Sequence, residues 1–192
     1  QEQTDLDVTN MGVTIGRKLL TRESNRARYV TCIDTGMITG YSGGYDSHDY
    51  HVAESARNVT HSIRSVADAI NRPGENDPSK LNLDDHLVLF TSEFGRTPYE
   101  EKRRVRGLNH WPFGFVVVMI GGPVTEDQRG VYGAIGPGGY ADSYITPPEF
   151  RASLLLAQGI WPFSPQSFAV GDVRNVNSEA DAVIQLRNRV LG

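Results

Sequence analysis

Apolar residues recur at helical spacing in four segments of the chain. In the first of these, Met11 and Ile15 lie on one face of a helix. The segment at residues 147–158 carries a helix signal at each end. Thr146 and Glu149 can form a capping box at its start, and Gly159 follows its end. The predicted helices cover residues 11–20, 51–71, 147–158 and 179–191.

Three short apolar runs predict β-strands. They are RYVTCID at residues 28–34, HLVLFT at 86–91 and GFVVVMI at 114–120. The second and third runs are nearly continuous in apolar residues, as in strands that are covered on both faces. The order strand, helix, strand, strand, helix predicts an α/β protein with a layered sheet.

Composition and charge narrow the class of protein. With 39% hydrophobic and 22% charged residues, the composition is typical of a globular protein. The 192 residues are enough for one domain, which we expect over residues 1–192, or for a piece of something larger. The formal net charge of −4 gives no electrostatic basis for binding nucleic acid. No apolar run approaches the roughly 20 residues that a membrane-spanning helix needs. The sequence therefore predicts neither a nucleic-acid partner nor a membrane span.

Side chains suited to metal binding lie in loops beside the predicted strands. Carboxylates and imidazoles are ligands of zinc, manganese and iron, whereas an oxygen-only set suits calcium or magnesium. An Asp-x-His step on an extended segment can direct two side chains to one point, because alternate residues face the same way. The sequence therefore predicts a metal site formed by Asp46, His48, Glu93 and His110, with Arg96 beside it.

Other interpretations of these residues stay open. An Asp-x-His step also occurs by chance, and a lone histidine before a tryptophan is often a structural residue. Glu93 can instead cap a helix or pair with Arg96. The basic segment 102–106 is either a solvated loop or, because it lies between two of the clusters, a segment that attracts an anion.

The order of several motifs resembles one family. The chain carries, in the order of that family, the motifs GGYDSH, LVLFTSEFGRTP, NHWPFGFVVVMIGG and ITPPEFRASLLLAQGI. They are similar to the carboxyl-terminal half of the sulfatase-like proteins of the domain-of-unknown-function 1501 family. The resemblance covers roughly residues 11 to 172 and is most specific at SEFGRTP and at the HWP step. The family belongs to the alkaline phosphatase and sulfatase superfamily, so the resemblance implies a layered α/β/α mixed sheet with metal ions at its carboxyl edge.

The resemblance also implies a role for each candidate residue. Asp46, His48 and His110 resemble the protein ligands of the first metal ion. Glu93 stands where the superfamily has the Asp of an Asp-His pair that binds a second metal ion. Arg96 would then clamp an anion or support Glu93. The implied cofactor is a divalent metal ion of the zinc, manganese or calcium class.

Two positions depart from the pattern of this family. Phe94 replaces the His of the Asp-His pair, which weakens the second metal site. Asn109 precedes His110 where the family usually has an Asp, and an amide is a poorer metal ligand and cannot act as a base.

In the superfamily, the nucleophile and another metal-binding Asp come from an amino-terminal half. We expect both to be supplied from outside this chain, by that missing amino-terminal half or by another subunit. The resemblance implies a metal-dependent hydrolase whose ligand is an anionic phosphate or sulfate ester. The alternative is a catalytically inactive module that keeps the fold for assembly or ligand binding. The family resemblance also suggests an exported, periplasmic or extracellular protein.

Overall fold

A computed structural model describes residues 8–36, 38–39, 42–46, 48, 51–101, 107–122 and 124–191. These residues form two compact units. The first comprises the described residues up to His86 together with Phe94–Pro112. The second comprises Leu87–Glu93 and the described residues from Phe113 onward. The single domain over residues 1–192 stays a prediction.

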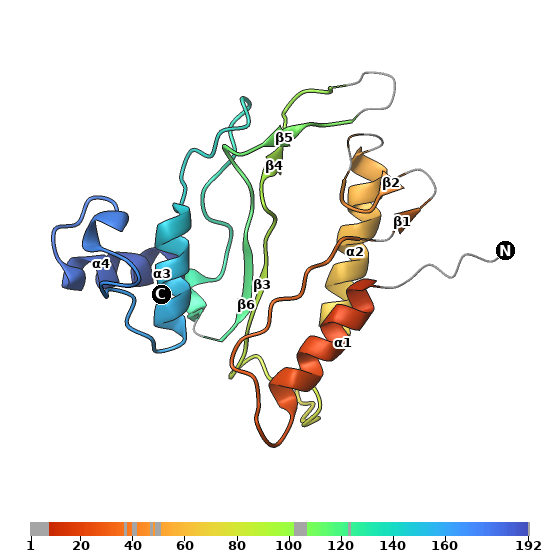
Figure 1. The fold of residues 1–192 in the computed structure, drawn as a ribbon, viewed down its shortest axis with the longest axis horizontal. Coiled ribbons are helices and arrows are strands. Elements are labelled where there is room, and N and C mark those ends of the chain that lie inside the picture. The colour runs from red at the N-terminus through yellow and green to blue at the C-terminus, as the bar shows by residue number, and fades with distance from the viewer. Residues whose placement is uncertain are drawn as a thin grey trace. The chain divides into compact units, whose positions relative to one another are not determined.

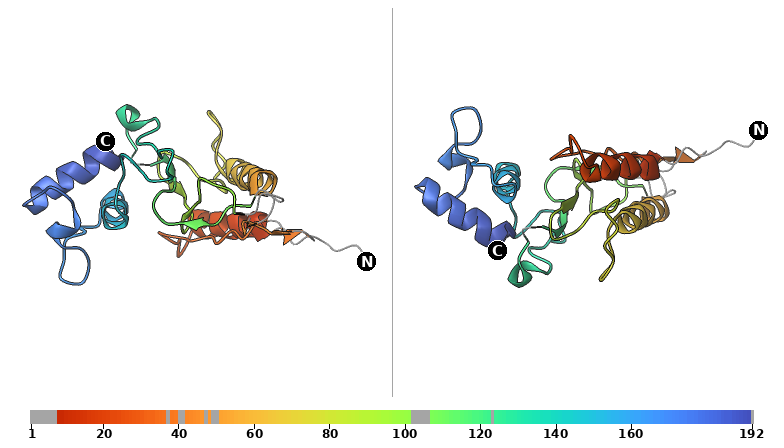
Figure 2. Two further views of the ribbon diagram at one scale, coloured as in Figure 1. Left: turned by 90° about the horizontal axis from the view of Figure 1, so that it is seen from above. Right: turned by 90° about the horizontal axis from the view of Figure 1, so that it is seen from below.

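Two helices dominate the first unit. Helix α1 spans Val8–Thr21 and helix α2 spans His51–Ala69, which confirms the helices predicted over residues 11–20 and 51–71. The two helices contact each other and lie side by side in the views of Figure 1 and Figure 2. Between them in the sequence, β1 (Ile38–Thr39) and β2 (Ser42–Gly43) form a short antiparallel ribbon within the Gly-rich loop.

Helix α2 packs through polar side chains rather than through its apolar stripe. Asn58 and Ser62 are almost fully buried, with exposed fractions of 1% and 8%. By contrast, Val52 and Ile63, two of the apolar residues that recur at helical spacing in this segment, are 74% and 53% exposed. In the first unit, the helix therefore buries these two polar residues more deeply than these two apolar ones.

The buried polar face of α2 meets the carboxylate of Asp34. This carboxylate accepts hydrogen bonds from the hydroxyl of Thr9 at 2.5 Å, the amide of Gly36 at 2.8 Å and the hydroxyl of Tyr45 at 3.3 Å, and a further one from Ser62. Partial burial by itself would raise the pKa of Asp34, but these hydrogen bonds outweigh it and lower the pKa below its usual range. Asp34 thus joins α1, α2 and the intervening loop.

The strand predicted at residues 28–34 is wrong. This segment forms no strand and pairs with no strand among the described residues. Its apolar side chains Tyr29 and Ile33 are 65% and 79% exposed. A β-branched run becomes a strand only where a neighbour supplies ladder hydrogen bonds, and no described neighbour does so here.

A hairpin that the sequence did not predict completes the first unit. Strand β4 (Gly95–Arg96) pairs antiparallel with β5 (His110–Trp111), with Arg96 opposite His110. The pairing continues one step further, because the amide of Thr97 donates to the carbonyl of Asn109 at 3.0 Å. Two-residue strands leave no hydrophobic periodicity to detect.

A second pair of strands belongs to the second unit. Strand β3 (Leu87–Phe90) pairs antiparallel with β6 (Val118–Gly121), so that Phe90 faces Val118. The strand predicted at 86–91 is confirmed, whereas the one predicted at 114–120 begins only at Val118. All four residues of β3 are half-buried and Val118 is 45% exposed, so the expected cover on both faces is not present.

The core of the second unit lies between two helices. Helix α3 (Pro147–Ala157) and helix α4 (Glu179–Leu186) both match their predictions, including the capping box between Thr146 and Glu149. A π-helical turn (Arg187–Leu191) continues α4, and two short 3₁₀ turns cover Glu126–Gln128 and Val170–Asp172. The buried cluster consists of Ala152, Phe163, Val173, Ala182 and Leu186.

The structure confirms a mixed α/β protein and shows no layered sheet. Among the described residues, the strands form three two-stranded antiparallel sheets. A layered α/β/α mixed sheet needs the apolar strands to pair side by side, but within the described part of the chain β3 pairs only with β6 and residues 28–34 form no strand. None of the helices in this part of the chain has the length and apolar character that crossing a membrane requires.

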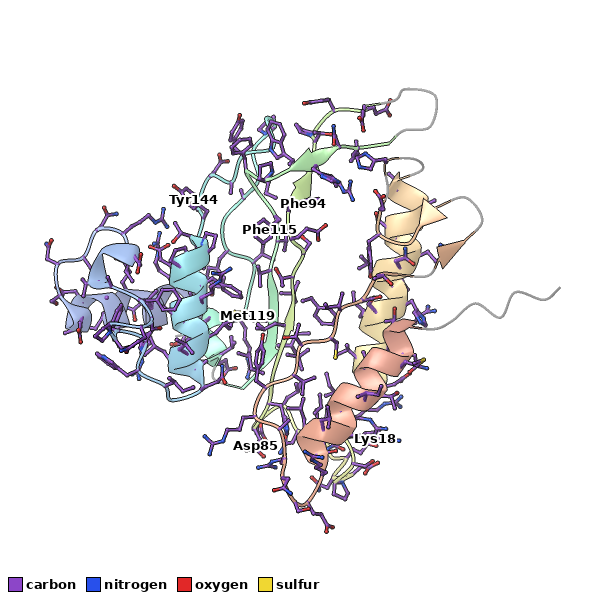
Figure 3. The ribbon with its side chains drawn as sticks, in the orientation of Figure 1. Lys18, Asp85, Phe94, Phe115, Met119 and Tyr144 are labelled. Carbon is purple, nitrogen blue, oxygen red and sulfur yellow. The ribbon has the colours of Figure 1, made fainter. Side chains whose placement is uncertain are left out.

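A buried carboxylate also forms a hydrogen-bonded ion pair in the second unit. Glu149, which is 1% exposed, accepts two hydrogen bonds from the Nε of Arg174, at 3.1 and 3.2 Å, and one from its Nη2 at 3.0 Å. The Arg174 guanidinium also lies 4.3 Å from the ring centre of Tyr144, just before the start of α3 (Figure 3). Burial by itself would raise the pKa of Glu149, but the hydrogen bonds from Arg174 and Thr146 lower it to about 2.

We expect Glu149→Gln to lower the free energy of unfolding by about 3 kcal/mol at neutral pH, because it leaves Arg174 without its charged partner. The pKa of Glu149 is lower in the folded than in the unfolded chain. The loss should therefore be constant above about pH 4.5 and shrink as the pH falls toward 2. Urea unfolding at several pH values measures this difference. Glu179→Gln, at an exposed position of α4, is the matched control and should change stability by less than about 0.5 kcal/mol.

Candidate metal centre

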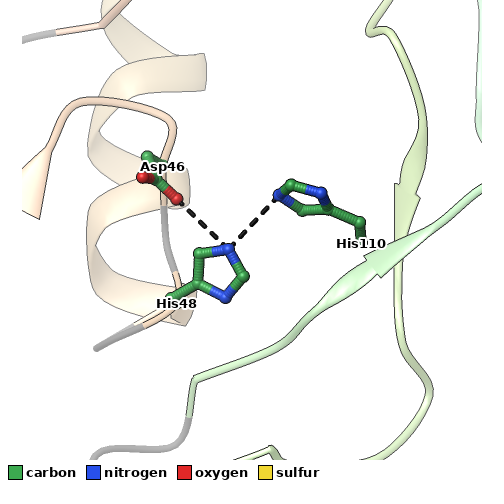
Figure 4. A group of neighbouring side chains, drawn as sticks. All are labelled: Asp46, His48 and His110. Atoms are coloured by element: carbon green, nitrogen blue, oxygen red, sulfur yellow. Dashed lines mark hydrogen bonds and ion pairs between the residues drawn. The ribbon is translucent and has the colours of Figure 1, made fainter.

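Three of the four predicted metal ligands meet in the first unit. The Nε2 atoms of His48 and His110 lie 3.2 Å apart, and Oδ1 of Asp46 lies 3.5 Å from Nε2 of His48 (Figure 4). One ligand atom from each of the three side chains lies within 4.8 Å of the others. His48 is half-buried, while Asp46 and His110 are exposed, so the group opens to solvent.

Two local structures carry these side chains. Asp46 and His48 follow β2, and His110 begins β5. The turn before Asp46 requires glycine at position 44, where φ is +77° and a Cβ atom would collide with the carbonyl oxygen of Thr35. The Tyr45 amide then donates to that same carbonyl at 3.1 Å, which fixes the backbone directly before Asp46.

A carboxylate that the sequence did not point to determines which ring nitrogen of His48 carries the proton. Oε2 of Glu101 lies 3.0 Å from Nδ1 of His48. Because a carboxylate only accepts hydrogen bonds, Nδ1 of His48 must donate, and in the neutral ring Nε2 then carries a lone pair. This lone pair is directed at Nε2 of His110, which donates to it in one tautomer of His110 and in the other tautomer presents a second lone pair.

The spacing of these atoms suits a metal ion between them. In a tetrahedral zinc site with bonds of about 2.0–2.1 Å, neighbouring ligand atoms lie about 3.3 Å apart. The observed separations of 3.2 and 3.5 Å are close to this value. Two imidazoles and one carboxylate are also a known set for a catalytic zinc ion, which keeps one coordination position open.

Comparison with protein families gives one match. The family described as "Protein of unknown function (DUF1501)" matches residues 20–182, which is most of the chain. The chain belongs to the DUF1501 family. Neither the curated proteins nor the solved structures contain a protein that matches this chain.

The fourth predicted ligand of this DUF1501 protein lies elsewhere in the chain. Glu93 is exposed and belongs to the second unit, three residues beyond the end of β3. The three converging side chains all belong to the first unit. A role of Glu93 in the metal site therefore stays a prediction.

Arg96 is engaged with the backbone of the first unit. Its Nη1 donates to the carbonyl of Leu108 at 3.3 Å, and its Nη2 donates to the carbonyl of Tyr45 at 3.1 Å. The second bond connects the β4–β5 hairpin to the residue before Asp46. This geometry favours a structural role for Arg96, and the anion clamp stays a prediction.

Phe94 supplies an apolar wall to the site of this DUF1501 protein. Its ring centre lies 4.2 Å from that of His110, with the two planes inclined by 32°. The Arg96 guanidinium lies 5.7 Å from the centre of the same phenyl ring. Phe94 therefore packs against a metal-ligand candidate. The basic segment 102–106 lies outside the described residues.

We expect Arg96→Lys to lower the free energy of unfolding by about 1 kcal/mol, because a single ammonium group cannot reach both carbonyls in the geometry of the guanidinium. Urea unfolding measures this effect, and phosphate titration by calorimetry should give the same affinity for both proteins. Arg64→Lys, at an exposed position of α2, is the control for the loss of a guanidinium. Weaker phosphate binding at unchanged stability would instead identify Arg96 as an anion clamp.

Proposed function

We propose that Asp46, His48 and His110 hold a divalent metal ion in a hydrolase-like protein that acts on phosphate or sulfate esters. The observation that carries the proposal is the 3.2 Å separation of the two Nε2 atoms, with the Asp46 carboxylate beside them. When His110 carries its proton on Nδ1, the two Nε2 lone pairs and the Asp46 carboxylate face one position, which a cation would fill. The motifs shared with sulfatase-like proteins support the choice of substrate class.

The ligand set favours some metals over others. Two imidazoles and a single carboxylate suit zinc or manganese, whereas calcium prefers oxygen atoms alone. A bound metal ion would polarise an ester oxygen and lower the pKa of a bound water. The exposed side of Asp46 and His110 leaves room for an anionic ester to approach, and Phe94 packs against the His110 ring.

We also propose that the remaining parts of the reaction site come from other segments. Resemblance to the superfamily supports a nucleophile from outside this chain, supplied by an amino-terminal half or another subunit. It also supports Glu93 as a ligand of a second metal ion and a layered α/β/α sheet in the assembled protein. The half-buried apolar side chains of β3 are consistent with a partner that covers this strand.

A second candidate function is a ligand-binding or assembly module without catalytic activity. Two substitutions favour it. Phe94 stands where the superfamily has a metal-binding histidine, and Asn109 stands where the family usually has an aspartate. The side chain of Asn109 donates to Glu101 and accepts from the His110 amide, so in this structure it acts as a hydrogen-bonding group.

Zinc and manganese titration of the chain tests the proposal. We expect one site per chain, and we expect His48→Ala and His110→Ala each to weaken it by roughly 100-fold or more. Such a loss exceeds the roughly 10–100-fold effect of removing an outer contact, because each variant removes a ligand. Asp46→Asn, which keeps the shape and removes the charge, should also weaken binding. Isothermal titration calorimetry measures each affinity.

The control is His86→Ala, since the Nδ1 of His86 lies 2.8 Å from the carbonyl of Asn82 and the ring takes no part in the group. Equal metal affinity in the wild type and in the His48 and His110 variants would contradict the proposed site. Phosphate titration of the zinc-loaded chain then separates the two functions. Phosphate binding that depends on the metal ion supports the hydrolase-like function. Metal binding without phosphate binding supports the ligand-binding or assembly module.

A further inference from the structure

We propose that Glu101 and Asn109 form a positioning pair that aligns both imidazole ligands, His48 and His110, for the metal ion. The proposal rests on the proposed metal site and adds to it two residues that make no contact with the ion. Glu101 selects the tautomer of His48, and Asn109 connects Glu101 to the backbone of His110.

Glu101 acts on His48 through one hydrogen bond. Its Oε2 accepts from Nδ1 of His48 at 3.0 Å, and the two side chains are 35% and 32% exposed. With Nδ1 holding its proton, Nε2 of His48 keeps its lone pair toward the position between His110 and Asp46. An imidazole ligand whose other nitrogen donates to a carboxylate is also a better electron donor.

Asn109 uses both ends of its side-chain amide. Its Nδ2 donates to Oε1 of Glu101 at 3.3 Å, and its Oδ1 accepts from the backbone amide of His110 at 2.8 Å. The backbone of Asn109 is fixed in turn, because its amide donates to Oγ1 of Thr97 at 3.0 Å. One side chain thus links the carboxylate on His48 to the residue that carries the second imidazole.

The hairpin brings the two members of the pair together. Arg96 lies opposite His110 in the β4–β5 register, and further along the hairpin the Glu101 amide donates to the carbonyl of Gly107 at 2.8 Å. Glu101 and Asn109 therefore lie on facing arms of one structure. Their relative position is set by backbone hydrogen bonds rather than by the metal ion.

The pairing also explains why an amide stands at position 109. An aspartate there would still accept from the His110 amide, but its second oxygen would meet Oε1 of Glu101. Two carboxylate oxygens at this distance repel each other. Glu101→Gln alone would create the opposite conflict, because its amide nitrogen would face Nδ2 of Asn109. With the proton kept on Nδ1 of His48, only the exchange of both residues keeps every donor opposite an acceptor.

The double variant Glu101→Gln with Asn109→Asp is therefore a designed rescue. In this variant, the side-chain oxygen at position 101 still accepts from Nδ1 of His48. The new amide nitrogen at position 101 donates to the new carboxylate at position 109, which still accepts from the His110 amide. Each single variant breaks one of these hydrogen bonds, so the cycle of four proteins measures their coupling.

The first measurement reads the tautomer of His48 in the metal-free chain. Long-range ¹H–¹⁵N spectra of ¹⁵N-histidine-labelled protein at about pH 8 distinguish protonation at Nδ1 from protonation at Nε2 in a neutral imidazole. We expect His48 to hold its proton at Nδ1 in the wild type and in the double variant. Glu101→Ala should move the population toward the Nε2-protonated form. An unchanged tautomer in a folded Glu101→Ala chain would overturn the proposal.

The second measurement is zinc affinity by calorimetry. We expect Glu101→Ala and Asn109→Asp to weaken binding by roughly 10–100-fold, and the double variant to recover most of the loss caused by Asn109→Asp. Glu75→Ala, which removes a carboxylate paired with Lys80 at 2.7 Å, is the control and should leave zinc affinity unchanged. A double variant that binds no better than the weaker single variant would contradict the role of Asn109.

The two measurements separate this proposal from the proposed function. If His48 in the wild type shows the expected tautomer but the protein binds no zinc, the proposed metal site is contradicted and the hydrogen-bonded pair is supported. If the wild type binds zinc through His48 and His110 but the tautomer of His48 does not change in Glu101→Ala, the metal site is supported and the positioning pair is contradicted. If Glu101→Ala does not fold, the single variants Glu101→Gln and Asn109→Asp and their combination still complete the test.

Discussion

The carboxylate of Asp34 is the constraint on which the first unit depends. It accepts hydrogen bonds from Thr9 of α1, from Ser62 of α2 and from Tyr45, the residue directly before Asp46. The Tyr45 carbonyl in turn accepts from Arg96 of β4. A continuous set of polar contacts therefore runs from the two helices to the hairpin that carries His110. Because these bonds have defined directions, they fix the loop of Asp46 more narrowly than apolar packing would.

Much of the secondary structure could be predicted from the sequence, because its causes are local. Helix α3 shows this best, since its capping box and its terminal glycine lie within the same short segment as the helix. The errors share a different cause. Residues 28–34 have the composition of a strand but no described partner, and β4 and β5 exist only because the hairpin pairs them. Which face of α2 is buried likewise depends on Asp34, which lies far from Asn58 and Ser62 in the sequence.

The residues of the candidate site also fall into two groups, those that could be predicted from the sequence and one that could not. Asp46, His48 and His110 could be found because carboxylate and imidazole side chains are recognisable as ligands by type. Glu101 could not, because a glutamate at the start of a charged segment carries no sign of its partner. Its role depends on the hairpin that sets it opposite Asn109 and on the loop that brings His48 to it. Glu101 lies 53 residues from His48 in the sequence, so a search for carboxylates close to that histidine in the chain would have missed it.

The position between the two imidazoles can be filled by a proton or by a metal ion, and the two compete. A protonated His48 would donate to Glu101 through Nδ1 and to either Asp46 or His110 through Nε2, so one of these two acceptors is paired without a metal. Metal ligation needs the same Nε2 lone pair, so binding must release that proton. Glu101 holds the proton on Nδ1 in both states and therefore does not take part in the competition. The exchange is confined to Nε2, at the side of the ring that faces His110 and the exposed carboxylate of Asp46.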